Sequence, residues 1–497
     1  MIPLNYGQLV MGLIPELLLV AAALAVLGVD LMVLREESKR TRFGFAAGFT
    51  GFASLAAVFW ITTSTEPMTL LEGSFIVSHL TQWVKVGLLL LTALTVAMFV
   101  DGEFTEHIGE CVALILFATV GMMLLVSAGD LLLLFVALEL VSLSLYALVA
   151  FDKRSKEGTH AALQYFLYGG MAAAFMLFGF SLLYGLTGST LIAEVGKGVA
   201  DKTGDPVLLV AMVMVMMGLG FKVAAVPFHL WAPAVYQGAP GPAAALVASG
   251  SKLASFVVVA RLMFAGFAGV EGDAAWRSYV QGWMPLLAGI AAFSMVLGNL
   301  AALAQSSLRR LLAFSAVAHA GYMLLGILAV KETGLQAVFY YAFTYGVATI
   351  GAFGVAVLVE RKRGGDSLVN LAGMAKQSPL MAVCLMVFIL SLAGIPPLAG
   401  FVGKFHVFLS ATAVKSPDLG LLWLVALAIA TSAISLYYYL QVLKQAWVVK
   451  GDEAATDLKP GVVTLVVLCL LAVITIVLGC VPEVILGPLG EALEQSW

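Results

Sequence analysis

Long apolar runs recur along this chain from its first residues to its last. About fourteen of them are close to the roughly 20 residues that an α-helix needs to cross the hydrocarbon core of a bilayer. Only 11% of the residues are charged, whereas soluble domains carry about 25%. The chain therefore lacks the polar residues to coat a water-soluble particle of its length. We expect an all-α integral membrane protein.

The expected spans follow one another with short turns between them, and no linker is long enough to hold a soluble domain. We therefore expect one polytopic membrane domain over residues 1–497. The spans cover residues 9–34, 43–62, 79–100, 109–127, 130–151, 160–186, 206–228, 242–268, 279–303, 308–330, 335–359, 379–414, 419–443 and 461–482.

Lysine and arginine concentrate in alternate connections. Clusters occur at residues 35–42, 153–156 and 361–363, and the opposite set of connections holds few basic residues. Because cytoplasmic loops of membrane proteins are enriched in lysine and arginine, we expect both termini on the periplasmic side of a bacterial inner (plasma) membrane. No basic residue precedes Arg35, so we do not interpret the first run as a signal peptide.

Several classes of function are disfavoured by what the sequence contains. The net charge is −3 and the four cysteines form no CxxC pair, so neither nucleic-acid binding nor a zinc or iron–sulfur site is expected. No phosphate-binding loop and no dinucleotide fingerprint is present. We expect no cofactor and no metal in this chain, so any redox cofactors must belong to partner subunits.

Charged residues inside the expected spans point to function. A charge at the bilayer centre costs about 2.5–3.5 kcal/mol on insertion scales, so those that are kept usually serve transport. The strongest candidates are Glu139, Lys222, Lys252 and Lys404. A second group, for which structural ion pairs are an open alternative, comprises Glu16, Asp30, Lys85 and Arg261.

Glu139 lies near the middle of its span, with Ser142 and Tyr146 on the same helical face. A cation that approaches a buried carboxylate favours its charged form, and a cation that leaves favours protonation. A lysine beside Glu139 would thus form a proton gate. The alternative is a carboxylate that only holds two helices together.

Lys222 precedes a proline, Pro227, within the same span. Broken helices at membrane depth are tolerated only where they face protein or water. We expect Gly218 and Gly220 to leave room beside the lysine, and its distance from the helix end to prevent it from reaching the interface. Snorkelling to the membrane surface is the alternative.

Two further lysines and two histidines extend the polar positions into other spans. Lys252 is surrounded by serines, and Lys404 follows the Pro396-Pro397 pair. His319 and His229 can relay protons because imidazole titrates near neutral pH. Isolated lysines at helix ends and satisfied core histidines are the alternatives. Together with Glu139 and Lys222, these residues indicate a proton relay or a cation path coupled to protons.

Residues 160–179 and 334–354 resemble each other, and each stretch precedes a span that contains proline. The two stretches lie five spans apart, and because this offset is odd, a repeat would be inverted in the membrane. Inverted repeats with broken helices are typical of secondary transporters. The similarity of any two helices rich in glycine, alanine and tyrosine is the competing explanation.

Three motifs identify a family. The chain resembles the N subunit (subunit 2) of proton-pumping NADH–quinone oxidoreductase, respiratory complex I, over nearly its whole length. Ala234 departs from the family pattern, which often has an acidic residue there. The motifs are VPFHLWAPAVYQGAPGPAAALVASGSKLASF at 226–256, SSLRRLLAFSAVAHAGYMLLG at 306–326 and LAGIPPLAGFVGKF at 392–405.

This resemblance implies an antiporter-like fold in which three N-terminal helices (1–108) precede two inverted five-helix repeats (109–270 and 271–445) and a C-terminal helix (446–497). Spans seven and twelve would be broken. Partner subunits would carry flavin, iron–sulfur clusters, NADH and quinone. The competing function is a subunit of a multisubunit cation/proton antiporter, or of a related ferredoxin-dependent complex.

The resemblance also implies an order of proton transfer, written here as the chain's own residues. It pairs Glu139 with Lys222 and continues through Lys252 and His319 to Lys404. If the two breaks are aligned on their prolines, Lys222 precedes its break and Lys404 follows its own. The sequence offers no explanation for this mismatch.

Overall fold

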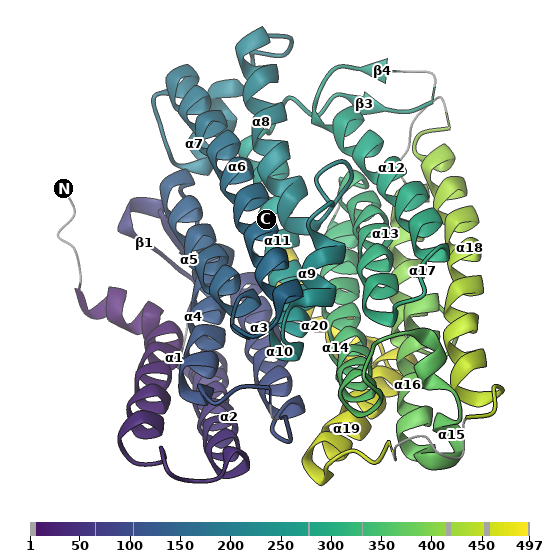
Figure 1. Cartoon of the computed structure of the whole chain (residues 1–497). Helices are drawn as coiled ribbons and strands as arrows, with labels where there is room; N and C mark the ends of the chain where they lie inside the picture. Colours follow the sequence, from purple (N-terminus) through teal and green to yellow (C-terminus); the bar gives the residue numbers. More distant parts are fainter. Residues whose placement is uncertain are drawn as a thin grey trace.

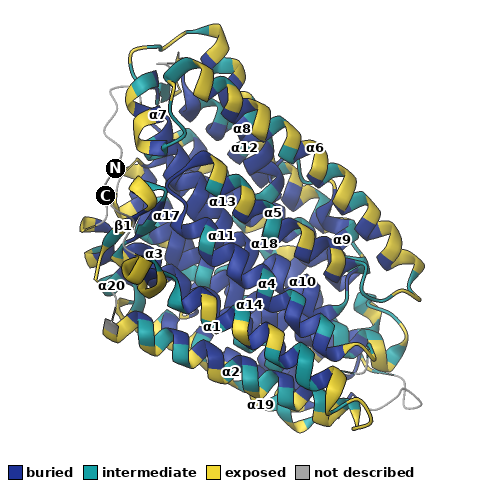
Figure 2. Cartoon of the chain, turned by 90° about the vertical axis from the view of Figure 1, so that its left-hand side faces the viewer, coloured by how far each residue is buried: buried dark blue, intermediate teal, exposed yellow. Residues whose placement is uncertain are grey.

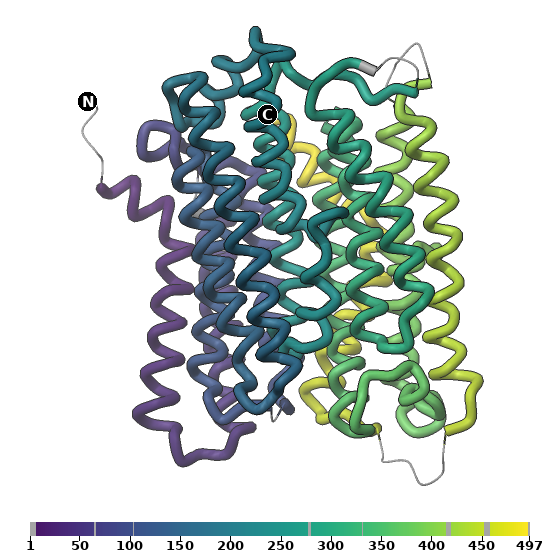
Figure 3. The backbone as a smooth tube through the Cα atoms, turned by 45° about the horizontal axis from the view of Figure 1, so that its top comes forward, coloured from purple at the N-terminus to yellow at the C-terminus, as the bar shows by residue number. Residues whose placement is uncertain are grey.

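Long helices running side by side between the two ends of the molecule make up almost the whole computed structural model (Figures 1 and 3). Thirteen helices in the described part of the chain are long and apolar enough to cross a membrane. The structure describes residues 6–64, 66–102, 104–276, 279–330, 332–413, 419–451 and 458–495.

The spanning helices confirm the expected all-α membrane fold. The eighth span is divided into α10 (Gly241–Ala248), α11 (Gly250–Arg261) and one π-helical turn, η2 (Leu262–Gly266). The other helices long enough to span are α1 (Tyr6–Met32), α2 (Lys39–Ser64), α3 (His79–Met98), α4 (Ile108–Ser127), α5 (Leu131–Val149), α6 (Lys156–Thr187), α8 (Pro206–Val223), α12 (Trp283–Leu303), α13 (Leu308–Leu328), α14 (Glu332–Arg363), α18 (Leu422–Trp447) and α19 (Val462–Cys480).

Two spans are interrupted where the prolines predicted a break. The seventh span ends as α8 at Val223 and resumes as α9 (Ala232–Gly238). The twelfth consists of α16 (Pro379–Ala393) and α17 (Ala399–Thr412). Neither half-helix is among the thirteen long helices, and counting the pair as one span brings the total to fourteen. The separation of α10 from α11 at Ser249 was not predicted, because no proline marks it.

The connections contain more structure than the short turns that we expected. Apolar side chains explain this difference: Leu70, Phe75 and Val77 of one hairpin pack together against the start of α1. The remaining elements are α7 (Ile192–Val199), α15 (Met374–Gln377), α20 (Glu483–Glu494), η1 (Leu71–Gly73), η3 (Leu368–Leu371), and the antiparallel pairs β1 (Met68–Leu70) with β2 (Phe75–Val77) and β3 (Asp273–Ala274) with β4 (Tyr279–Val280).

The order of elements in the first half of the bundle recurs in the second. α4 and α5 precede the 32-residue helix α6 and a broken span. α12 and α13 likewise precede the 32-residue helix α14 and a broken span. The recurrence agrees with two repeats of five spans, and the domain boundaries given above remain predictions.

The basic residues of alternate connections gather at one end of the bundle. Lys39 and Lys153 line the same surface pocket at that end. Arg40 forms an ion pair with Asp101, which lies beside Arg361 in a second pocket. The gathering agrees with the charge asymmetry read from the sequence.

Two ion pairs fix α1 to its neighbours. Glu16 Oε1 lies 2.7 Å from Lys85 Nζ of α3, and both side chains are buried. Asp30 accepts bonds of 2.7 and 2.6 Å from the Arg42 guanidinium and one of 2.9 Å from the Gly109 amide. For Glu16, Asp30 and Lys85, the alternative of structural ion pairs is therefore supported.

The most buried helices lie at the centre of the bundle, as Figure 2 shows in dark blue. They include α14 and the two helices α11 and α13, each of which contacts α14. The charged residues of the candidate site lie on or beside these helices. Water and lipid therefore reach them only along paths that the surrounding side chains permit.

Candidate functional site

Lys222 and Glu139 face the same seam between α5 and α8. Lys222 Nζ donates a 2.6 Å hydrogen bond to Ser142 Oγ, one turn along α5 from the glutamate. The Ser142 hydroxyl donates in turn to the Leu138 carbonyl, 2.6 Å away. Glu139 Oε1 is buried and has no hydrogen-bond partner among the described residues. The two charges act on each other electrostatically.

The structure changes the predicted pairing in one respect. Across the described ranges, no ion pair within 4.0 Å joins Glu139 to Lys222. A neutral serine holds the ammonium instead, so the carboxyl group can take up a proton without first breaking a direct contact with a cation. A direct pair would require the lysine side chain to swing from Ser142 to Glu139.

Two details of the Lys222 prediction were wrong. The lysine lies in the last turn of α8, not far from a helix end. That end lies at the break within the span, so the interface is still remote. Gly218 and Gly220 make room for other side chains: added Cβ atoms would come 2.6 Å from Met176 and 2.5 Å from Phe228.

Tyr146 also lies beside the carboxylate, as its position on α5 predicts. Its hydroxyl fits into a space left by Gly169 of α6, where an added Cβ would come within 1.8 Å of the oxygen. Its ring meets the Tyr165 ring edge-on, with centroids 4.8 Å apart. The first half of the site is therefore closely packed around the serine and the glutamate.

Lys252 is buried on α11 and points across to the second half of the bundle. Its Nζ donates to the Ala316 carbonyl of α13 at 2.5 Å. The same nitrogen lies 5.0 Å from the centre of the Tyr345 ring on α14. Within the described ranges no carboxylate pairs with this ammonium, so a carbonyl and an aromatic face stabilise its charge.

His319 occupies the centre of the second half of the site. Its Nδ1 shares a 2.6 Å hydrogen bond with the Tyr341 hydroxyl, and its Nε2 shares one of 3.0 Å with the Tyr439 hydroxyl. A neutral imidazole donates from one nitrogen and accepts at the other, so tyrosine hydroxyls satisfy both functions. The Tyr345 ring that lies beside Lys252 is also 4.9 Å from the histidine ring.

Lys404 lies on the far side of His319. Its Nζ donates to the Ala393 carbonyl and to Ser432 Oγ, both at 3.0 Å. It also lies 5.2 Å from the centre of the Tyr322 ring, which in turn meets the histidine ring at 5.8 Å. Lys252 and Lys404 thus flank the histidine, each with one aromatic ring between.

The position of the Lys404 nitrogen resolves the mismatch between the two breaks. Ala393 is the last residue of α16, so Lys404 reaches back from α17 to the end of the preceding half-helix. Lys222 occupies the last turn of α8, the corresponding half-helix. Both lysines are therefore associated with the C-terminus of a half-helix, Lys404 through its nitrogen and Lys222 through its place in the last turn, and there the helix dipole favours a cation.

Aromatic hydroxyls are the part of the site that sequence analysis missed. Tyr322 accepts a 3.0 Å hydrogen bond from Asn299 Nδ2, and Tyr438 donates to Asn299 Oδ1 at 3.0 Å. Tyr439 also shares a short hydrogen bond with Ser315. The paired tyrosines of FYYAFTYG and LYYYL were the available signal, but such residues are common in any membrane helix.

The structure does not bring every candidate together. His229 lies in the break between α8 and α9, half-buried, and its Nδ1 has no hydrogen-bond partner among the residues described. No hydrogen bond or ring contact in the described part of the chain links it to His319. The same is true of the step from Lys222 to Lys252.

The arrangement suits proton transfer, because neutral acceptors, aromatic rings and one imidazole separate charges that titrate. It does not resemble a metal site: in the ranges that the structure describes, no three histidine, cysteine, aspartate or glutamate side chains gather to hold an ion.

Comparison with known proteins gives consistent matches. The family described as "NADH:quinone oxidoreductase/Mrp antiporter, TM" matches residues 128–435. NADH-quinone oxidoreductase subunit N 2 of Acidobacterium capsulatum is 48% identical, covering 97% of this chain and 99% of that protein.

Solved structures agree with the sequence matches. A chain of respiratory complex I from Thermus thermophilus with bound aureothin is 33% identical, with a TM-score of 0.77 over 95% of this chain and 98% of that chain. A chain of the Mrp complex from Dietzia sp. has a TM-score of 0.80 over 97% of both chains, at 23% identity, which shows the shared fold alone.

Proposed function

The chain belongs to the subunit N family of NADH-quinone oxidoreductases, within the wider NADH:quinone oxidoreductase/Mrp antiporter family, and we propose that it translocates protons as an antiporter-like membrane subunit of such a complex. It acts as part of a proton-translocating oxidoreductase. Other subunits carry the flavin and iron–sulfur clusters and transfer electrons from NADH to quinone.

The observation that carries this proposal is the buried row of Lys252, His319 and Lys404. Burying a cation without a partner is unfavourable, and here both lysines are held by carbonyl or hydroxyl oxygens and aromatic rings. Such neutral partners tolerate either protonation state of the amine. The row can therefore pass a proton without leaving a broken ion pair.

The first half of the site acts as the gate of this row. While Ser142 holds the Lys222 ammonium, the Glu139 carboxyl retains a proton. When the lysine swings to the carboxylate, the charged form is stabilised and the proton leaves. The chain lies in a bacterial inner membrane with both termini on the periplasmic side.

Purification of the tagged chain from its native membrane tests its place in the complex. We expect flavin and iron–sulfur absorbance together with NADH–quinone activity in the tagged fraction. Colourless hydrophobic partners without dehydrogenase activity would contradict the proposal.

Substitution of the gate residues tests the relay separately. Glu139→Gln and Lys222→Ala should lower NADH-driven proton uptake by inverted membrane vesicles while the complex still assembles. Glu157→Gln, an exposed carboxylate at the start of α6, is the matched control. Normal uptake in either gate variant would refute the relay.

A further inference from the structure

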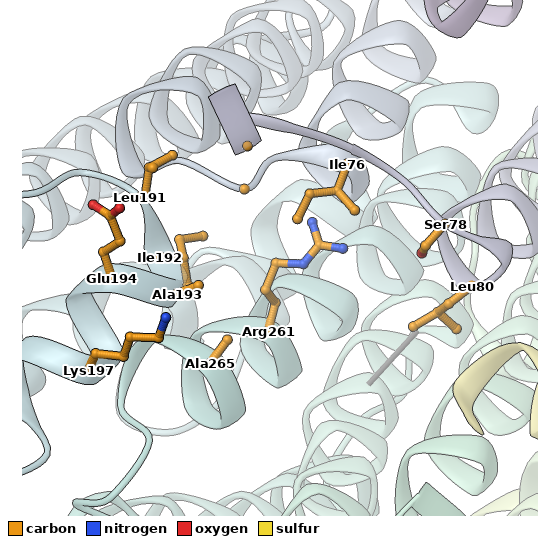
Figure 4. A pocket seen from close by; sticks show the side chains of 12 residues that line it. Ile76, Ser78, Leu80, Leu191, Ile192, Ala193, Glu194, Lys197, Arg261 and Ala265 are labelled. Atoms are coloured by element: carbon orange, nitrogen blue, oxygen red, sulfur yellow. The ribbon is translucent and has the colours of Figure 1, made fainter. Parts of the chain in front are cut away.

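A cavity of about 370 Å³ is lined by residues outside the charged row described above (Figure 4). Its wall is formed by β2, the start of α3, the N-terminal half of α7 and the end of α11 with η2. The volume falls within the range of ordinary ligand pockets, about 300–1,000 Å³. The relay described above does not use it.

Arg261 lines this cavity and is the most unusual residue in it. Its side chain is only 8% exposed. Nη1 donates to the Val126 and Ala128 carbonyls, both at 2.7 Å. For the donors on Nε and Nη2, no acceptor is found among the described residues. A buried cation is normally paired or bound to an anion.

No carboxylate in the described ranges compensates the Arg261 charge. Glu194 also lines the cavity, but it is exposed and its carboxylate accepts a short bond from Ser189. Lys197 lies one turn further along α7, and Figure 4 shows it to the left of Arg261, whose guanidinium points toward Ile76 and Ser78. The charged side chains of the cavity thus carry a net positive charge.

The wall around these charges is firmly built. Gly196 allows α7 to pack against η2, because an added Cβ would come within 1.9 Å of the Ala265 carbonyl oxygen. The segment before α7 is tied to α5, since Leu131 donates to Thr190 O and Ile192 to Gly129 O, both at 2.9 Å. A site of this kind is formed before any ligand arrives.

The surroundings favour an oxyanion over other ligands. Guanidinium groups bind phosphate-type oxygens with two parallel N–H donors, and Nε and Nη2 form such a fork. Leu191, Ile192 and Ala193 at the start of α7 also line the cavity. Apolar side chains, including Ile76 and Leu80, cover part of the remaining wall.

We propose that the cavity between α3, α7 and α11 binds a phosphate-type anion through Arg261 and Lys197. The phosphate is either the headgroup of an anionic phospholipid or a free ion. Its negative charge compensates the buried guanidinium, and the apolar wall accommodates the carbon atoms next to a lipid phosphate.

Binding to the purified full-length chain in detergent tests this proposal. The probes are inorganic phosphate, followed by its effect on the melting temperature, and phosphatidylglycerol, followed as retained adducts by native mass spectrometry. Lys197→Gln should weaken binding about fivefold, as expected for one basic residue near an anionic lipid. Ala193→Trp should abolish binding, because Ala193 lines the cavity from an exposed position.

Two further variants complete the test. Arg261→Gln should abolish binding of both probes if the variant folds. If this variant does not fold, the Lys197 and Ala193 variants test the proposal. Lys156→Gln is the matched control, because it also removes one exposed lysine. Lys156 lies at the start of α6, and the cavity-lining helix α7 follows the opposite end of α6.

The two probes distinguish the sources. Retention of phosphatidylglycerol without an effect of phosphate would identify a lipid headgroup, and a response to phosphate alone would identify a free anion. Failure of the wild-type chain to bind either probe would overturn the proposal. Equal binding by the wild type and by the Lys197 and Ala193 variants would also overturn it.

Discussion

Replacement of Ser142 by alanine removes the one hydrogen bond that the Lys222 ammonium makes to a side chain in the described part of the protein. The Ser142 hydroxyl competes with Glu139 for the lysine. Without it, we expect the ammonium to turn to the carboxylate and to stay there. The gate would then remain in the state that excludes a proton from Glu139.

The size of this shift follows from the bond that is lost. A hydrogen bond to a charged group contributes about 1.5–3 kcal/mol, which corresponds to a population change of about tenfold to a hundredfold. Proton translocation that depends on the lysine leaving Glu139 should slow by up to that factor. Stability should change little, because the direct ion pair replaces the lost bond.

Inverted membrane vesicles that contain the assembled complex provide the assay, with NADH oxidation and proton uptake followed together. Ser144→Ala is the matched control, since Ser144 is also buried on α5 but has no comparable contact with Lys222. Proton uptake per NADH equal to that of the wild type in Ser142→Ala would refute the gate reasoning. An equal loss in both variants would assign the effect to packing.

Three further changes test other parts of the structure. Gly394→Ala should displace Lys404, because Gly394 has a φ of +87° and its Cβ would lie 2.9 Å from the lysine Cδ; unaltered proton uptake would contradict this. Lys85→Met should destabilise the protein by about 3–5 kcal/mol in thermal or denaturant unfolding, since it leaves Glu16 buried and unpaired. Adding Glu16→Leu should restore most of that loss, and a double variant as unstable as the single would disprove the cause. Tyr439→Phe keeps the ring but removes a hydroxyl bonded to the buried histidine, so it should slow proton uptake without impairing assembly, and a normal pH–rate profile would count against a role in the relay.

Local signals explain which parts of the fold were predictable. A span is recognised by its length and apolar composition, and a break by proline, so the interruptions near Pro227 and Pro396 were found. The break at Ser249 carries no such mark and was missed. The helix α7 is only 8 residues long and lies outside the apolar runs.

The partners of the charged side chains were less predictable, because they belong to other helices. Ser142 was placed correctly on the face of Glu139, but nothing local indicates that it holds Lys222. The tyrosines that hold His319 come from α14 and α18, at positions where aromatic residues are ordinary. Sequence identified the residues that carry charge, and tertiary packing decides what each one touches.

The two lysines at the breaks have a consequence for how the halves of the chain are compared. Aligned on their prolines, Lys222 corresponds to Ser391 and Lys404 to Val235. In this sequence alignment neither lysine is matched by a charged residue in the other half. Both lysines nevertheless belong to corresponding helix ends, because Lys222 lies in the last turn of α8 and Lys404 reaches back from α17 to the last residue of α16. If the halves arose from one ancestral duplication, selection preserved the place of the lysine in the fold while its position in the sequence changed. Such halves should therefore be compared by superposing their structures before their sequences are aligned.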